Sequence, residues 1–594
     1  MRLRVTTALV PCAVALLALG GGAAHAVDPV VPADHQEFLS SGGFTPELGS
    51  LQAPSGPTGK GAPPRVGPNL RVNAAQVLPG AGLLGRSETA IAATLDGSDL
   101  VAGWNDAQGF CGQPFGAACT PQSPPGLSGY AFSTDGGLTW TDGGAPPVLN
   151  HVFTRGDPWL ARGGTDGGTF FYANLAVDDR DAAVSLGVSV HRGGFSGAGF
   201  SWNDVRTFDS PNNPGNCVAG QPPTPAACDF YDKESITAQP GTGNAYVTLT
   251  NFQGQPTIAP GCGNQAQFGF GQIEVWRTHD GGNTWQGPAL AGPEAADSVA
   301  SCGNTGTLQQ SSVAAVGPNG EVYDVWQFGP TFTPATSTDA DIDFARSLDG
   351  GATFSAPSKV ADINSLRQNP PVGYNRDRIN DHPRVAVATT GKFKGRVYAV
   401  YYSSLAPVVA PPATAAACLT PVPANTRCRP QTLTSSQVFL RFSDDRGATW
   451  SPEIALAPTP PATGVKRFWP VVTVEPGGDV DVVFYESQER QATADPTDVE
   501  CDVNLGGGIR RQGLNSSLVD TWWVHSSDGG ATFGAPTRIT SATSNWCKAV
   551  SNIRPNFGDY IGSASGGNRV LTVWGDGRNG APDTFYASGL AAKP

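Results

Sequence analysis

The sequence predicts an all-β protein built from repeated antiparallel sheets, and three observations lead to this prediction. Gly and Pro contribute 76 and 51 of the 594 residues, and charged residues make up only 15%. This composition is typical of short strands joined by tight turns, and it argues against a coiled coil or a charged disordered chain. In addition, an eight-residue turn occurs five times and a longer hairpin pattern occurs seven times.

The N-terminal region is expected to lie outside the fold. Residues 1–26 carry Arg2 and Arg4, an apolar stretch over 8–19 and a small-residue cleavage site ending at Ala26, which together predict a secretory signal peptide. Residues 27–70 are rich in Pro and Gly and are expected to form a flexible leader, so that 71–594 forms the folded part. No later segment has about 18 consecutive apolar residues, so no membrane span is expected.

The charge balance limits the partners of the chain. The net charge is −13, and loss of the two signal-peptide arginines would take it to −15. Such an acidic chain is a poor candidate for binding nucleic acid or anionic lipid through its net charge. We therefore expect that the protein binds neither nucleic acid nor a membrane. With its predicted signal peptide, it is expected to be a secreted, extracellular monomer.

Ten cysteines remain after the signal peptide, an even number that predicts disulfides in an exported chain. Pairing each cysteine with its nearest neighbour gives five bridges, although other pairings stay open. These are Cys111–Cys119, Cys217–Cys228, Cys262–Cys302, Cys418–Cys428 and Cys501–Cys547. No CxxC pair is present, which argues against a thiolate zinc site.

The longer repeat is a hairpin of two β-rich runs followed by a third run. Its copies begin near residues 87, 157, 233, 311, 381, 468 and 559, at spacings of 70 to 91 residues. Units of this kind predict four-stranded blades that close radially into a β-propeller. The count predicts seven blades, with six as the alternative. The last unit lacks a fourth strand, which residues 69–77 are expected to supply.

The short repeat has the pattern Ser/Thr-x-Asp-x-Gly-x-Thr-Trp/Phe. Its Asp can accept hydrogen bonds from backbone amides in a turn, and its Gly permits positive φ. The five copies are residues 133–140, 278–285, 347–354, 443–450 and 526–533. This turn resembles the Asp box, or bacterial neuraminidase repeat, of the sialidase superfamily and of related Asp-box propellers.

The resemblance implies a carbohydrate-active protein with a glycan or glycoconjugate ligand, and an exo-α-sialidase or related glycoside hydrolase as the leading activity. Sialidases hold the substrate carboxylate with arginines and use a tyrosine–glutamate pair as nucleophile and an aspartate as acid/base. The expected catalytic candidates here are Tyr560, Tyr231, Glu234, Asp157 and Asp232. The expected substrate-binding candidates are Arg86, Arg384, Arg467 and Arg554.

Two departures from the family keep other functions open. The first inner strand reads GRSETAIAA and lacks the Arg-Ile-Pro motif of sialidases, and seven blades differ from the six of that family. A non-catalytic glycan- or protein-binding propeller and a polysaccharide lyase, for which His382 is the candidate base, are the alternatives. No cofactor is firmly predicted, but the carboxylates at the starts of the inner strands are suited to Ca²⁺.

Overall fold

The computed structural model describes residues 64–591, except 77–83, 108–125, 179–186, 212–228, 255–267, 294–306, 331–338, 368, 377, 409–411, 420–421, 458–462, 492–500, 507–508 and 513. The predicted signal peptide and nearly all of the predicted leader are outside this part. Within it, no helix has the length and apolar character needed to cross a bilayer. The elements are almost all strands, with a short 3-10 helix, η3 (Ala415–Ala417).

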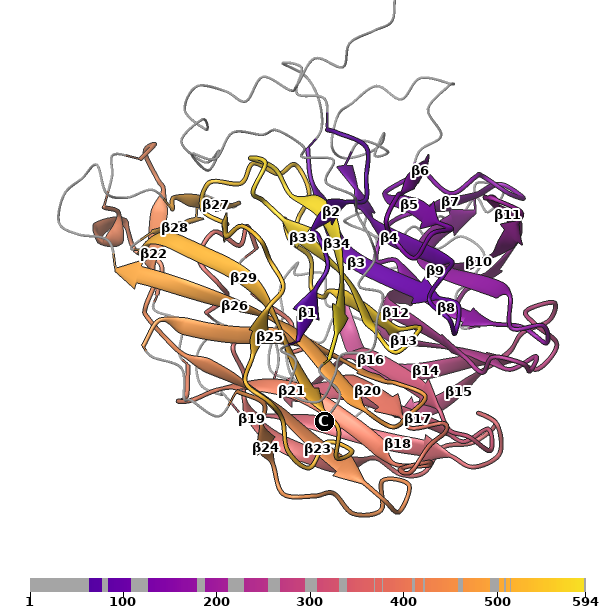
Figure 1. Ribbon diagram of the computed structural model, residues 1–594. Helices are drawn as coiled ribbons and strands as arrows, with labels where there is room; N and C mark the ends of the chain where they lie inside the picture. The colour runs from indigo at the N-terminus through magenta and orange to yellow at the C-terminus, as the bar shows by residue number, and fades with distance from the viewer. Residues whose placement is uncertain are drawn as a thin grey trace, which may run out of the picture.

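Four antiparallel sheets follow one another along the first half of the chain (Figure 1). The first contains β3 (Arg86–Ala93), β4 (Leu100–Asp106), β5 (Ser128–Ser133) and β6 (Thr141–Gly144). The second contains β7 (Val152–Thr154), β8 (Trp159–Gly163), β9 (Thr169–Asp178), β10 (Gly187–Ser196) and β11 (Gly199–Phe208). The third contains β12 (Phe230–Ala238), β13 (Ala245–Gly254), β14 (Phe268–Thr278) and β15 (Gln286–Gly292). The fourth contains β16 (Thr307–Val316), β17 (Val322–Pro330), β18 (Asp339–Ser347) and β19 (Ser358–Asn364).

A nine-stranded sheet follows. It contains β20 (Arg384–Val387), β21 (Val397–Ser404), β23 (Ser436–Ser443), β24 (Ile454–Ala455), β25 (Val465–Val474), β26 (Val480–Gln491), β29 (Leu514–Ser526), β30 (Thr537–Arg538) and β31 (Ser544–Asn545). Beside it lies a small sheet of β22 (Arg427–Pro430), β27 (Val503–Gly506) and β28 (Ile509–Gln512).

The last sheet joins the two ends of the described chain. It contains β32 (Gly562–Ser565), β33 (Val570–Asp576) and β34 (Asp583–Leu590), and its outer edge is filled by β1 (Arg65–Val66) and β2 (Leu70–Arg71). Figure 1 shows indigo β1 beside yellow β34. β2 lies within residues 69–77, which were expected to supply this strand, whereas β1 lies in the predicted leader. Together they cover a strand edge that would otherwise be exposed.

The sheets are arranged as a β-propeller. The inner strands β3, β8, β12, β16, β20, β25 and β32 each contact the next, β32 contacts β3, and together they surround one central cavity. Counted as separate sheets of four or five strands, however, the described residues form five blades. The expected seven separate blades are corrected because a parallel bridge between Ser436 and Lys466 joins β23 to β25. Strands assigned to two blades from the sequence thereby form one hydrogen-bonded sheet.

The five repeated turns share one hydrogen-bond pattern. In the first, the Ser133 hydroxyl donates to Asp135 (2.8 Å) and accepts from the Gly137 amide (2.9 Å), while the Thr139 amide donates to Asp135 (2.9 Å). The same bonds recur around Asp280, Asp349, Asp445 and Asp528. The spacing of the repeat is therefore explained by the needs of the turn itself.

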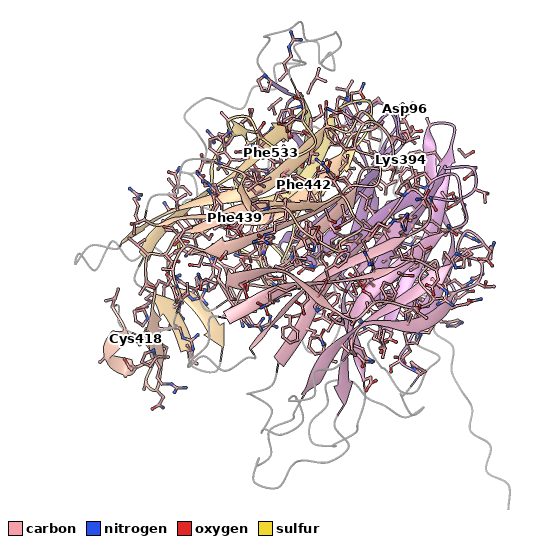
Figure 2. The ribbon with its side chains drawn as sticks, turned by 90° about the horizontal axis from the view of Figure 1, so that it is seen from below. Asp96, Lys394, Cys418, Phe439, Phe442 and Phe533 are labelled. Atoms are coloured by element: carbon pink, nitrogen blue, oxygen red, sulfur yellow. A yellow bond between two sulfur atoms is a disulfide. The ribbon has the colours of Figure 1, made fainter. Side chains whose placement is uncertain are left out.

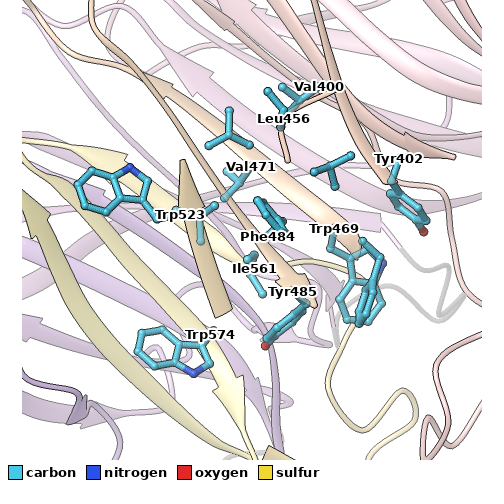
Figure 3. Packing of buried hydrophobic residues seen from close by; sticks show 14 of the residues in the cluster. Val400, Tyr402, Leu456, Trp469, Val471, Phe484, Tyr485, Trp523, Ile561 and Trp574 are labelled. Carbon is cyan, nitrogen blue, oxygen red and sulfur yellow. The ribbon is translucent and has the colours of Figure 1, made fainter. Parts of the chain in front are cut away.

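Aromatic side chains fill the largest core cluster, shown in Figure 3. Trp546 stacks on Phe557 with ring centroids 4.1 Å apart and also packs against Trp469. Both tryptophans are 1% exposed. They stabilise the packing of the nine-stranded sheet against the last sheet and are not platforms for a sugar ring.

Two of the predicted disulfides lie in the described chain and are present: Cys418–Cys428 and Cys501–Cys547. The cysteines of the other three predicted pairs lie outside the described residues. Cys428 belongs to the small sheet, in which β22 pairs in parallel with β28. In Figure 2, Cys418 lies at the opposite end of the molecule from Asp96 and Lys394, which belong to hairpin turns. The disulfides therefore reinforce connections on the face opposite those turns.

Candidate functional site

The starts of the inner strands share an unusual backbone conformation. Glu88, Asp157, Lys233, Ser311 and Trp469 all have positive φ, between 47° and 66°. In β3, β12, β16 and β25 the residue lies at a register shift, where the strand bulges from its partner. Side chains other than Gly adopt this conformation at a cost, and such positions concentrate at functional sites. Two of the bulges carry charged residues, Glu88 and Lys233, and Asp157 has the same conformation just before β8.

Lys233 is the hub of the resulting cluster. Its Nζ lies 3.1 Å from Glu88 Oε1 and 2.9 Å from Asp559 Oδ2, and it also donates to Asp157 Oδ2. The Lys233 side chain is 5% exposed, and those of Glu88 and Asp559 are fully buried. Burial disfavours the ammonium, but the three carboxyl groups prevail and raise the pKa of Lys233 well above its usual value. One buried cation in the third sheet thus links the first, second and last sheets at the centre.

A segment between β19 and β20 covers this cluster. The Tyr374 hydroxyl donates to Asp559 Oδ1 (2.8 Å), and the Arg376 guanidinium donates to the same oxygen. The amide of Asn380 donates to Asp559 Oδ2 (3.1 Å). We call residues 365–381 the strap.

Contacts on both sides fix the strap. The buried pair Lys466–Glu489 (2.6 Å) meets it where Glu489 accepts from the Val372 amide (3.0 Å). On the other side, Asn375 and Asn556 exchange two backbone-to-side-chain bonds of 3.2 and 2.9 Å. Hydrogen bonds on both sides therefore hold the strap in place over the site.

Two neighbouring aspartates in this region have pKa values displaced in opposite directions. Burial, followed by the charge of Asp157, raises the pKa of Asp232 to about 6, although Lys233 opposes this. For Asp157 burial also acts upward, but the Lys233 ammonium prevails and lowers the pKa below its ordinary value. Asp232 is half-buried and Asp157 is 9% exposed. Near pH 5 a protonated Asp232 therefore lies near an ionised Asp157, and such a pair is suited to acid/base catalysis.

The two tyrosine candidates lie in different places, and each donates a hydrogen bond to a fixed acceptor. Tyr560 donates to the Pro158 carbonyl (2.9 Å), and Tyr231 donates to Glu274 (2.9 Å). Burial, then nearby carboxylates, raises the pKa of both hydroxyls, which opposes formation of a phenolate nucleophile. Tyr231 is thus hydrogen-bonded to Glu274 and not to the other candidate, Glu234. The ladder of β12, β13 and β14 places Tyr231 beside Glu274 instead.

Glu234 is buried beside the cluster, and neither of its carboxyl oxygens bonds to another residue of the described chain. Burial, followed by the charge of Asp157, raises its pKa well above the usual value. The alternative base His382 is also buried, between the rings of Trp159 and Tyr560. Burial and then Arg384 lower its pKa well below the usual value, so its ring stays neutral.

The four candidate arginines lie in different surroundings. Arg86 pairs with Asp106 (3.0 Å), Arg467 pairs with Glu486 (2.8 Å), and Arg554 is exposed. The Arg384 guanidinium lies 4.3 Å from the centre of the Trp159 ring. The contacts given above for Arg86, Arg384 and Arg467 within the described chain are with different residues.

Among the described residues, no group of three or more His, Cys, Asp or Glu side chains is arranged to hold a metal ion. The carboxylates expected to suit Ca²⁺ do converge, but they do so on Lys233, whose ammonium supplies the positive charge. The Lys233 side chain is therefore the cation at the centre of the ring.

Sequence reasoning missed Lys233, Tyr374 and Arg376. Lys233 stands between Asp232 and Glu234 in the same charged tripeptide, which was a usable signal. The strap residues stand in a segment with no strand pattern, and only the tertiary structure places them over Asp559.

Comparisons with known proteins reveal fold-level likeness only. No family model and no curated protein matches the chain. The chain is similar to a solved structure of an unknown-function protein from Dyadobacter fermentans, with 15% identity, 77% of this chain and 98% of the other covered, and a TM-score of 0.37. It is similar to an α-L-arabinanase of Penicillium chrysogenum complexed with arabinobiose, with 13% identity, coverage of 76% and 98%, and a TM-score of 0.39. It is also similar to a Trypanosoma rangeli sialidase in complex with sialic acid, with 10% identity, coverage of 76% and 56%, and a TM-score of 0.37. At these values the likenesses say nothing about the reaction of this protein.

Proposed function

We propose that this protein is a secreted glycoside hydrolase that uses two carboxyl groups. Asp232 is the general acid that protonates the leaving oxygen, and Asp157 is the carboxylate that acts as nucleophile or base. The observation that carries the proposal is the opposite displacement of the two pKa values in adjoining sheets. The two disulfides support an extracellular location.

The neighbouring residues suit this role. Lys233 keeps Asp157 ionised, and Gln310 donates to Asp232 Oδ2 at 3.3 Å. Arg155, two residues before Asp157, is half-buried, and its guanidinium has no ion pair or hydrogen bond with any described residue. It is available to an acidic group on a sugar. The proposal replaces a tyrosine nucleophile, because Tyr560 and Tyr231 each donate to a fixed acceptor.

The proposal also includes the repeat architecture. The shared bonds of the five turns support their assignment as Asp boxes. The ring of inner strands supports a reading of the nine-stranded sheet as two blades, with β20, β21, β23 and β24 in one and β25, β26, β29 and β30 in the other. On that count the propeller has seven units.

The test is turnover of a panel of fluorogenic glycosides, including an α-sialoside and an α-L-arabinofuranoside, near pH 5. Asp232→Asn and Asp157→Asn are expected to lower kcat by about 10²–10⁴-fold. Asp362→Asn is the matched control because its side chain is exposed, and it is expected to retain full turnover. Equal turnover in all four proteins would refute the assignment.

A second function is favoured by one specific observation. The strap covers Asp559, and the side chains of both Asp559 and Glu88 are fully buried. This supports a glycan-binding propeller that performs no chemistry. Glycan binding without turnover of any glycoside, and unchanged by Asp232→Asn, is the outcome expected for that function.

A further inference from the structure

A cavity of about 350 Å³ occupies the centre of the ring. Its wall is formed by all the inner strands, and Arg384, Trp159 and Tyr560 line one end. Each of these residues follows a strap or cluster residue along the chain, namely Asp381, Asp157 and Asp559. The aromatic rings of Trp159 and Tyr560, 5.1 Å apart, therefore separate the cavity from the charge cluster. Arg162 and Pro240 line the other end, beside hairpin turns.

Arg384 is a buried cation without a counter-charge. It is 4% exposed, and within the described part of the chain it forms no ion pair and one hydrogen bond, from Nη1 to the Pro383 carbonyl at 3.3 Å. Its Nε is buried without a partner. Its other contacts are with the faces of Trp159 and Tyr560, at 4.3 and 5.3 Å. Burial lowers its pKa to about 9. A desolvated charge in this state is costly unless an anion binds to it.

The cavity wall carries further unused polar groups. Among the described residues, β3, β12, β16, β20 and β32 each pair with one strand only, which leaves the backbone groups of the inner edge free of sheet partners. The hydroxyls of Thr473, Ser563 and Ser565 line the cavity and are buried without hydrogen-bond partners. These groups can donate to an anion or to the water around it.

We propose that this cavity binds a small organic carboxylate, whose oxygens accept hydrogen bonds from Arg384. A guanidinium matches a carboxylate through two parallel hydrogen bonds, and it is more strongly attracted to one in a site shielded from water. The cavity has the volume of about ten water molecules at roughly 30 Å³ each. It therefore has room for a carboxylate with several carbon atoms. This site is separate from the proposed hydrolase site and does not depend on that activity.

The test is isothermal titration of the secreted protein with acetate, butyrate and benzoate at constant ionic strength. Butyramide is the uncharged analogue and is expected not to bind. Arg384→Met is expected to weaken butyrate binding at least tenfold. Arg538→Met is the matched control, because that arginine is exposed and paired with Asp520, and it is expected to leave binding unchanged.

A second variant covers the case in which Arg384→Met does not fold. Ala386 is two residues along β20 from Arg384, and so on the same face, and it lines the cavity. Ala386→Leu is expected to weaken benzoate binding more than acetate binding. The proposal is overturned if butyrate and butyramide bind equally, if chloride displaces butyrate with the affinity of a carboxylate, or if Ala386→Leu affects all three carboxylates equally.

Discussion

Lys233 and Asp559 form an ion pair of 2.9 Å at the centre of the propeller, although they belong to the third and the last sheets. Asp559 also receives hydrogen bonds from Tyr374 and Arg376 of the strap. Burial opposes its ionisation, but Arg376 and then Lys233 hold its pKa well below the usual value. The Asp559 carboxylate therefore links the last sheet to the third sheet, through Lys233, and also binds the strap.

Lys233→Met is expected to destabilise the protein by about 3–5 kcal/mol, because it leaves buried carboxylates without their cation. The measurement is the free energy of unfolding from a urea titration. Lys359→Met removes a lysine that is half exposed and paired with Asp341 and Asp362, and it is expected to cost less than about 1 kcal/mol. Equal losses in the two variants would show that the central pairs contribute no more than surface pairs.

The hydrolysis that we propose is expected to have a bell-shaped pH dependence. Asp232 must be protonated to act as an acid, so activity falls as the pH rises through about 6. Asp157 must be ionised, and since its pKa is below the ordinary value of 3.8, activity falls on the acid side only below about pH 4. The measurement is kcat against pH on the best glycoside. If kcat does not fall until the pH reaches 9 or above, Asp232 is excluded as the general acid.

Asn73→Leu is expected to weaken the closure of the last sheet. The Asn73 side chain donates to Asp583 (2.8 Å) and accepts from the Thr584 amide (2.7 Å), and it is 3% exposed. Loss of both bonds leaves buried polar groups unsatisfied, at about 1–3 kcal/mol each. Thermal unfolding of this variant is to be compared with that of Asn203→Leu, at an exposed position of β11. An equal fall of the unfolding temperature in Asn73→Leu and Asn203→Leu would contradict a role of the N-terminal segment in closing the last sheet.

The two disulfides are expected to contribute unequally. Cys501–Cys547 closes a loop with a sequence separation of 46 and Cys418–Cys428 one of 10. The chain-entropy relation gives about 4 and about 2.7 kcal/mol for loops of these sizes. Replacing each pair by serines and measuring urea unfolding checks this order. A larger loss from the shorter loop would show that local packing outweighs loop entropy.

The repeated turns are expected to lose their contribution to stability in acid. Hydrogen bonds from Thr353 and Thr449 lower the pKa values of Asp349 and Asp445 to about 2. A carboxyl group whose pKa is lower in the folded state stabilises the protein above its unfolded value, here 3.8, and this contribution is lost as the pH falls through about 2. Asp445→Ala is expected to melt below the wild type at pH 6, by a margin that shrinks between pH 4 and 2. A margin independent of pH would mean that the charge of Asp445 plays no part.

Local chemistry explains the predictions that the structure confirms. The five turns close through bonds within eight residues, so their pattern is visible in the chain. Nearest-neighbour pairing identified Cys418–Cys428 and Cys501–Cys547 correctly. The missing fourth strand of the last repeat indicated that an N-terminal segment would pair with β34. Each of these features depends on spacing, which a sequence records directly.

The sequence by itself determined the propeller, its repeated turns and the charged starts of its inner strands, because hydrophobic alternation and turn residues act over short distances. Only the tertiary structure decided which charges meet. It brought Lys233 to Glu88, Asp157 and Asp559, paired Tyr231 with Glu274, laid the strap over the centre and fused two expected blades through Ser436 and Lys466. The physical reason is that these contacts depend on backbone bulges and on the closure of the ring, which bring residues tens to hundreds of positions apart within hydrogen-bond distance.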